Sequence, residues 1–202
     1  MGKKALSGRK NWQQQGGLKA LQAVTNLYDV FSDYFKGTEY ILHKKPKHLK
    51  NLYAKVMLPQ NIIEQIYNPT LDLTKTKWGV SPDFAIENTK TKKILFGEIK
   101  RQDGWVEGKN PSAGRGNAHE RLCKLFTPGL LKAYREIGGI DSDDTLPFWV
   151  VFEGDITRDP KRNREIAFWF DKYENNYFMW RPNMTGEDLV MHFEKKLKKY
   201  LD

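Results

Sequence analysis

The stretch that decides the fold is residues 82–100, which read PDFAIENTKTKKILFGEIK. Two segments rich in apolar residues, 80–87 and 93–100, flank a polar run at residues 88–92. Strand-like segments joined by a short polar connection are typical of a β-hairpin. The sequence therefore predicts two neighbouring antiparallel strands here.

Three ionisable residues of this hairpin, Asp83, Glu98 and Lys100, are expected to meet on one face of the sheet. A turn centred between Lys90 and Thr91 sets Asp83 directly across from Glu98, where opposed Cβ atoms lie about 5 Å apart. Because side chains alternate along a strand, Glu98 and Lys100 share a face. A slip of one residue in the pairing would turn this set over.

Two carboxylates and an amine in this arrangement suit metal-dependent phosphodiester hydrolysis. Asp83 and Glu98 supply the oxygen ligands that Mg²⁺ prefers, and Mg²⁺ keeps several waters, one of which can attack a phosphate. The ammonium of Lys100 can place that water or neutralise the charge that builds on the phosphate. The alternative is a solvated strand face on which these residues form only a weak salt bridge.

The composition describes a basic, folded protein of 202 residues. Lys and Arg outnumber Asp and Glu by 34 to 25, and the resulting charge of +9 attracts polyanions, of which nucleic acid is the commonest in a cytoplasm. The apolar content of 39% excludes a disordered basic tail. A single cysteine, Cys123, excludes an internal disulfide and a multi-cysteine zinc site, and we expect it to pack as a small hydrophobe.

Membrane and secretion signals are missing from the sequence. The longest wholly apolar run, residues 148–152, is far shorter than the roughly 20 residues that a membrane span needs. The first six residues lack the hydrophobic core of a signal peptide. We therefore expect a soluble intracellular protein without a membrane partner.

Hydrophobic periodicity predicts helices around a mixed sheet. Residues 1–16 are basic and polar, which indicates an N-terminal arm, and residues 17–35 have the spacing of an amphipathic helix. No linker divides residues 17–202, so we expect a single α/β domain with a mixed central β-sheet flanked by helices. Further helices are expected at residues 59–67, 117–126, 130–137 and 186–201, and further strands at residues 147–153, 165–170 and 177–180.

The pattern Pro82-Asp83 followed by Glu98-Ile99-Lys100 resembles the motif of the PD-(D/E)xK nuclease superfamily. The resemblance implies a restriction-endonuclease-like core in which Asp83 and Glu98 bind Mg²⁺ and Lys100 assists attack by water. All three would then be catalytic residues.

A second segment, residues 116–121, reads GNAHER and is similar to the recognition segment GNAIER of EcoRI-like restriction endonucleases. The resemblance implies that Asn117, Ala118, Glu120 and Arg121 read an inner AATT, and Asn and Arg side chains do suit base edges in the major groove. Asn117 and Glu120 also have the spacing of a helix capping box, and the two interpretations can coexist. The DNA-binding residues expected here are Arg115, Gly116, Asn117, Ala118, Glu120 and Arg121.

Arg115 and His119 depart from the EcoRI pattern, which has a small residue and an apolar residue at these positions. Because Arg can bond bidentately to guanine, we expect Arg115 to read an outer C·G pair, with a phosphate contact as the alternative. His119, near a helix start, is expected to be solvated or packed. The order of elements and the chain length resemble an EcoRI-like enzyme that cuts CAATTG.

The resemblance thus implies a magnesium-dependent type II restriction endonuclease of the bacterial cytoplasm. It would cut both strands of palindromic DNA with an AATT core, CAATTG, after the first C, and leave a 5′-AATT overhang. Because one such site cuts one strand, we expect a two-fold homodimer, with residues 17–202 holding both catalysis and DNA recognition. The alternatives are a structure-selective nuclease such as a junction resolvase, and a DNA-binding protein without catalysis.

Overall fold

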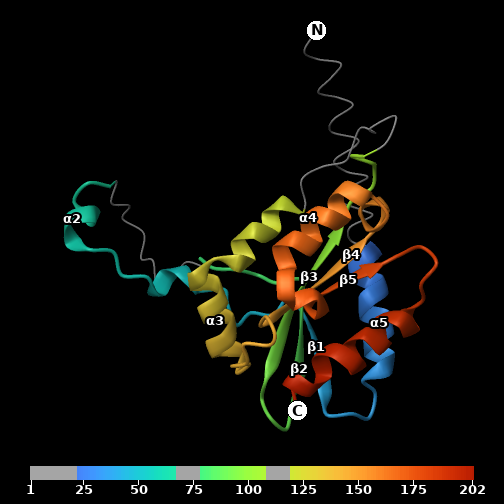
Figure 1. Cartoon of the computed structure of the whole chain (residues 1–202). Helices are drawn as coiled ribbons and strands as arrows, with labels where there is room; N and C mark the ends of the chain where they lie inside the picture. The colour runs from blue at the N-terminus through green and yellow to red at the C-terminus, as the bar shows by residue number, and fades with distance from the viewer. Residues whose placement is uncertain (1–21, 67–77, 108–118) are drawn as a thin grey trace.

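The computed structural model describes residues 22–66, 78–107 and 119–202, which are arranged around one five-stranded sheet (Figure 1). The strand order is β1-β2-β3-β4-β5; β2 is antiparallel to both β1 and β3, and β3, β4 and β5 run parallel. The predicted mixed sheet is therefore confirmed. The strands are β1 (Tyr40–Lys44), β2 (Phe84–Asn88), β3 (Ile94–Arg101), β4 (Phe148–Glu153) and β5 (Tyr177–Trp180).

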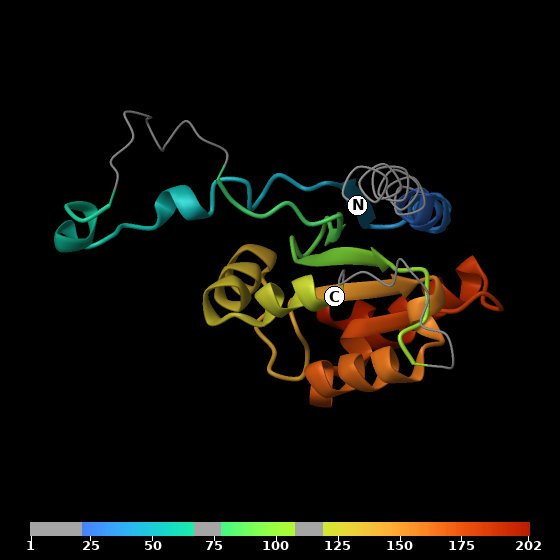
Figure 2. The ribbon, with the colours of Figure 1, turned by 90° about the horizontal axis from the view of Figure 1, so that it is seen from above.

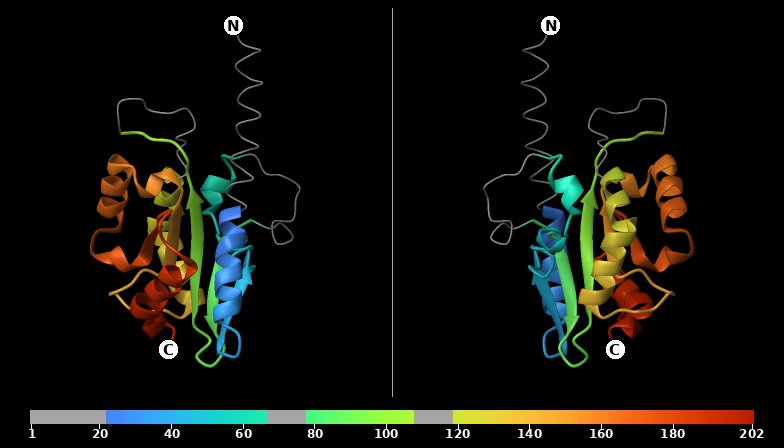
Figure 3. Two further views of the ribbon diagram at one scale, coloured as in Figure 1. Left: turned by 90° about the vertical axis from the view of Figure 1, so that its right-hand side faces the viewer. Right: turned by 90° about the vertical axis from the view of Figure 1, so that its left-hand side faces the viewer.

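Helices cover both faces of the sheet (Figures 2 and 3). One core cluster joins the sheet to α3 (Pro128–Gly138), α4 (Pro160–Phe170) and the 3-10 helix η3 (Glu120–Phe126). A second cluster joins the other face to the helix of residues 22–34 and to α5 (Gly186–His192). The shorter helical segments are η1 (Tyr53–Lys55), α2 (Gln60–Ile63), η4 (Asp155–Thr157), η5 (Asp171–Asn176), η6 (Phe193–Leu197) and η7 (Lys198–Tyr200).

The hairpin of β2 and β3 has the predicted register. Phe84 pairs with Gly97, so Asp83 and Glu98 lie one step further along the two strands, on the face opposite to Phe84. The neighbouring Ile99 is buried in the second core cluster. Alternation along β3 therefore separates the ionisable side chains from an apolar residue that anchors the strand.

Gly97 is required because the ring of Phe84 lies directly over β3. A Cβ at Gly97 would stand 2.0 to 2.4 Å from three carbons of that ring, closer than real Cβ atoms approach. We expect Gly97→Ala to lower the free energy of unfolding by about 1–3 kcal/mol, because the ring and the strand must separate. Denaturant unfolding measures this loss. Gly129→Ala in α3 is the matched control, since a Cβ there meets nothing within 4 Å; equal stability of the two variants would contradict the crowding.

One predicted strand is wrong. Residues 165–170 form the second half of α4, which begins after Asp159. The Asp159 carboxylate caps this helix by accepting hydrogen bonds from the backbone N–H groups of the first turn, and Pro160 suits the first helical position. The buried Ile166 and Phe170 are four residues apart, which is helical spacing, so the apolar run faces the core from a helix.

Other boundaries differ from the sequence-based expectation. Strand β1 was not predicted, because its residues lie at the start of a Lys-rich run; it forms by pairing with β2. The helix expected at residues 59–67 is only α2, the segment expected at 117–126 is a 3-10 helix that begins at Glu120, and α3 begins at Pro128 rather than residue 130. The last helix continues from α5 into a π turn and a 3-10 turn, and Thr185 caps its start in a capping box with Asp188.

Three remaining expectations concern the arm, the cysteine and the membrane. The basic arm of residues 1–16 lies outside the described residues. Cys123 is exposed on η3 instead of packed, because the buried side of that helix is formed by Leu122 and Leu125. No helix among the described residues combines the length and the apolar character needed to cross a membrane.

Candidate active site

The structure brings the three ionisable hairpin residues together. Asp83 immediately precedes β2, and Glu98 and Lys100 lie on the adjacent half of β3. The Lys100 Nζ atom is 2.5 Å from Glu98 Oε2 and 3.8 Å from Asp83 Oδ2. One ammonium therefore stands between carboxylates that come from two different strands.

Backbone contacts fix the position of Asp83. Its Oδ2 atom accepts a hydrogen bond from the backbone N–H of Ile99 at 2.9 Å. The hydroxyl of Tyr28 donates to the backbone carbonyl of Asp83 at 3.2 Å and to that of His43 at 3.0 Å. The helix of residues 22–34 thus fastens the start of β2, and β3 orients the carboxylate.

The site is more buried than a solvated strand face. The side chain of Glu98 is 7% exposed and that of Lys100 is 19% exposed, whereas Asp83 is 31% exposed. Burial raises the pKa of Glu98, and the charge of Asp83 raises it further, while the ammonium of Lys100 opposes the shift. Two carboxylates with a single ammonium between them leave net negative charge, which a cation can neutralise.

The donor set fits Mg²⁺. Carboxylate oxygens are hard ligands, and Mg²⁺ is commonly held by only one or two carboxylates together with water and substrate phosphate. No group of three or more His, Cys, Asp or Glu side chains that could hold a metal occurs within residues 22–66, 78–107 and 119–202. In this part of the chain the candidate metal ligands are therefore the two carboxylates of Asp83 and Glu98.

Two side chains near the triad were not found by sequence reasoning. Tyr134 of α3 is buried, and its hydroxyl has no hydrogen-bond partner among the described residues. Burial raises its pKa, and the negative charges of Glu98 and Asp83 raise it further. The positive charge of Lys124 on η3 lowers the pKa of Glu98. Neither residue belongs to a local motif, because only the packing of η3 and α3 over β3 brings them close.

The predicted DNA-binding residues lie partly outside the described chain. Arg115, Gly116, Asn117 and Ala118 fall within residues 108–118, which the structure does not describe. Glu120 and Arg121 are exposed at the start of η3, the helix that also carries Lys124. His119 is fully buried, so of the two expectations for this ring packing is the correct one.

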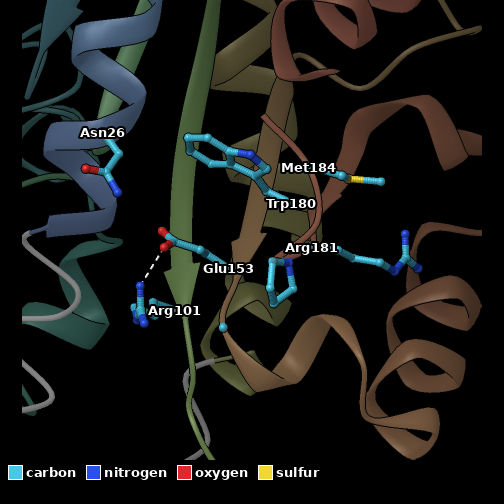
Figure 4. Close-up of a pocket in the computed structure, with 8 residues that line it drawn as sticks. Asn26, Arg101, Glu153, Trp180, Arg181 and Met184 are labelled. Carbon is cyan, nitrogen blue, oxygen red and sulfur yellow. Dashed lines mark hydrogen bonds and ion pairs between the residues drawn. The ribbon is translucent and has the colours of Figure 1, made fainter. Parts of the chain in front are cut away.

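A separate hollow of about 290 Å³ lies at the carboxyl ends of β3, β4 and β5 (Figure 4). Arg101 follows Lys100 on β3 and therefore points to the opposite face from the triad. Its guanidinium is 2.5 Å from Glu153 and 3.6 Å from Asp103, which neutralise its charge. This hollow is therefore distinct from the candidate active site.

Comparison with known proteins identifies the family. The family model described as type II restriction enzyme MunI matches residues 1–202. The type II restriction enzyme MunI of Mycoplasma sp is 73% identical over 202 residues, which cover 100% of both chains. The crystal structure of MunI restriction endonuclease in complex with cognate DNA is also 73% identical, with a TM-score of 0.83 over 95% of this chain and 98% of that chain. The chain carries an ionisable triad on a mixed sheet and is similar to these proteins throughout its length. It therefore belongs to the family of type II restriction enzyme MunI, whose members are site-specific endonucleases.

Proposed function

We propose that this restriction enzyme cuts double-stranded DNA at the palindrome CAATTG, after the first C, and leaves a 5′-AATT overhang. The observation that carries the catalytic part is the contact of one ammonium, Lys100, with carboxylates from two strands, Asp83 and Glu98. The related MunI endonuclease was crystallised with its cognate DNA, which supports DNA as the substrate. A restriction enzyme accounts for the whole chain better than a junction resolvase or a non-catalytic DNA-binding protein.

Asp83 and Glu98 are the residues that would hold Mg²⁺. When bound there, the ion would act as a Lewis acid at a phosphate oxygen and lower the pKa of coordinated water. The chain itself contributes a rigid arrangement of ligands, since Asp83 is held by the N–H of Ile99 and Glu98 by the ammonium of Lys100. The negative charge of the two neighbouring carboxylates would favour binding of the cation. With that charge neutralised, an anionic phosphate could bind next to the cation.

Lys100 has two roles in the proposed mechanism. Before DNA binds, its ammonium favours the charged form of Glu98 and so opposes the rise in the pKa of Glu98 that burial causes. A metal held by Asp83 and Glu98 would neutralise these carboxylates, and the ammonium of Lys100 would then orient the attacking water and stabilise negative charge on the phosphate. In-line attack by water breaks the bond to the 3′ oxygen, which leaves as the 3′ hydroxyl, and the phosphate stays on the 5′ end.

Sequence recognition is assigned to the run from Arg115 to Arg121. We propose that Asn117, Ala118, Glu120 and Arg121 read the inner AATT, that Gly116 allows close approach to DNA, and that Arg115 reads the outer guanine. The exposed positions of Glu120 and Arg121 at the start of η3 support this assignment.

A palindromic substrate and one active site per chain require two copies. We propose a two-fold homodimer in which each subunit reads one half-site and cuts one strand. The cytoplasm, which holds bacterial DNA, is the compartment proposed for the enzyme.

Incubation with a plasmid that carries a single CAATTG site tests the proposal directly. With Mg²⁺ we expect one double-strand cut, and run-off sequencing of the ends should place it after the first C on both strands. A plasmid with GAATTC instead, and a reaction in EDTA, are the controls that should stay uncut. Cleavage at GAATTC, or only at branched DNA, would refute the proposed specificity.

The outer base pair can be tested through Arg115. If Arg115 bonds bidentately to guanine, Arg115→Ala should weaken binding to a CAATTG duplex by about ten- to a hundredfold and leave binding to unrelated DNA nearly unchanged. Titration of both duplexes at one salt concentration measures the two affinities. An equal loss on both duplexes would instead identify Arg115 as a phosphate contact.

A further inference from the structure

Residues 108–118, which include most of the proposed DNA-reading run, are flanked by Glu107 and His119. These two flanks contact the same helix, α4, and its N-cap residue Asp159, although the bonded residues lie 52 positions apart before the run and 43 after it. Each contact involves a fully buried polar residue, Asp159 before the run and His119 after it. One helix is therefore bonded to both flanks.

The flank after the run is held by a buried cluster on one face of α4. The ring of His119 is fully buried and stacks on Trp169, with ring centroids 5.3 Å apart and 13° between the planes. Its Nε2 atom is 2.6 Å from Nη1 of Arg162 and 3.2 Å from Glu165 Oε2, and Arg162 is 2.7 Å from Glu165. The residues that hold this ring recur at helical spacing along α4.

Arg162 favours an unprotonated Nε2 atom on this ring. A guanidinium can only donate, so Nε2 of His119 accepts in its contact with Arg162. Burial and the adjacent charge of Arg162 lower the pKa of His119, which agrees with that assignment, although Glu165 and Glu120 oppose the shift. The Nη1 atom of Arg162, a residue that is 7% exposed, contacts both His119 and Glu165, and an apolar residue at position 119 would remove the first of these acceptors.

The flank before the run is held by Asp159, the N-cap residue of the same helix. Asp159 is fully buried and divides its two oxygens between two tasks. Its Oδ1 accepts from the backbone N–H groups of Lys161 at 3.0 Å and Arg162 at 3.2 Å, which caps α4. Its Oδ2 accepts from the backbone N–H groups of Val106 and, at 3.1 Å, of Glu107. Burial alone would raise the pKa of Asp159, but these four donors lower it, so the carboxylate is ionised.

We infer that α4 is the anchor of the DNA-reading run, with Asp159 fixing the chain before it and Arg162, Glu165 and Trp169 fixing His119 after it. Because His119 directly precedes the exposed Glu120 and Arg121, its position sets where those two side chains begin. The inference rests on the proposed function. It assigns these α4 residues as positioning residues for sequence recognition, separate from the triad on the hairpin.

Two variants test the anchor from its two ends. Arg162→Met removes the donor to His119, whereas Asp159→Asn keeps an oxygen to cap α4 but places an amide, which cannot accept, toward Val106 and Glu107. The control is Lys132→Met, at an exposed residue on α3 whose ammonium lies 3.7 Å from Glu136. Circular dichroism and thermal unfolding report whether each variant is folded. Arg162→Lys restores a cationic donor at this position, so it should recover most of the sequence recognition that Arg162→Met loses.

The measurement is single-turnover cleavage of a CAATTG duplex, and of a duplex with one base pair changed, over a range of enzyme concentrations. For both variants we expect the half-saturating concentration on CAATTG to rise about tenfold or more, with a smaller preference over the changed duplex. The plateau rate on saturated CAATTG should stay within about threefold, because the triad is untouched. Lys132→Met should match the wild type.

Folded variants with unchanged half-saturation and preference would overturn the anchor, and so would a loss confined to the plateau rate. If Arg162→Met fails to fold, Asp159→Asn and Arg162→Lys decide by the same measurements. Failure of the proposed function is distinguishable, because the wild type itself would then show no preference for CAATTG.

Discussion

Asp83→Ala is expected to lower the rate of DNA cleavage by about a thousandfold while sequence-specific DNA binding persists. Asp83 supplies one of the two carboxylates proposed to hold the metal, and loss of about 4 kcal/mol of transition-state stabilisation corresponds to that factor. Its side chain accepts a bond only from the N–H of Ile99 among the hydrogen bonds described, so its removal leaves the strand pairing intact.

Binding should even become tighter in the absence of metal. In the proposed mechanism the carboxylates of Asp83 and Glu98 face the scissile phosphate, so deleting one would remove like-charge repulsion. A gel-shift titration in EDTA measures binding, and single-turnover cleavage in Mg²⁺ measures the rate. Asp143→Ala, at an exposed position remote from the hairpin in sequence, is the control and should leave both unchanged. Undiminished cleavage by Asp83→Ala would remove the proposed mechanism.

Lys100→Met should lower the cleavage rate by about a hundredfold or more, because it removes the ammonium that we propose orients water and neutralises charge on the phosphate. Methionine keeps the length and the apolar stem of lysine, so the packing of β3 is preserved. Cleavage should remain dependent on Mg²⁺, since Asp83 and Glu98 are both present. A rate within about threefold of wild type would exclude the assigned role of Lys100.

The same variant should change the pH dependence of DNA binding without metal. Burial already raises the pKa of Glu98, and Lys100 opposes that shift, so loss of the ammonium raises this pKa further. Protonated Glu98 no longer repels phosphate, so binding in EDTA strengthens as the pH falls through this pKa, and the midpoint should lie at higher pH in Lys100→Met. Fluorescence anisotropy over a pH series measures both midpoints, with Lys132→Met as control; coincident midpoints would argue against coupling between Lys100 and Glu98.

Local patterns predicted the hairpin and its register correctly, because a short turn leaves few ways to pair two strands. The same local logic failed for residues 165–170, where an apolar run was interpreted as a strand. These residues form a helix because Asp159 caps its start and because Ile166 and Phe170 are buried against the core. Of these two causes, only the capping residue can be recognised in the sequence.

The sequence by itself determined that Asp83, Glu98 and Lys100 belong to one hairpin face, because strand alternation and turn position are properties of adjacent residues. Only the tertiary structure decided that this face is buried enough to raise the pKa of Glu98, since burial depends on what packs over β3. It also decided the partners of His119, which come from α4, far along the chain. Contacts between distant segments depend on how the helices pack on the sheet, and no local spacing encodes that.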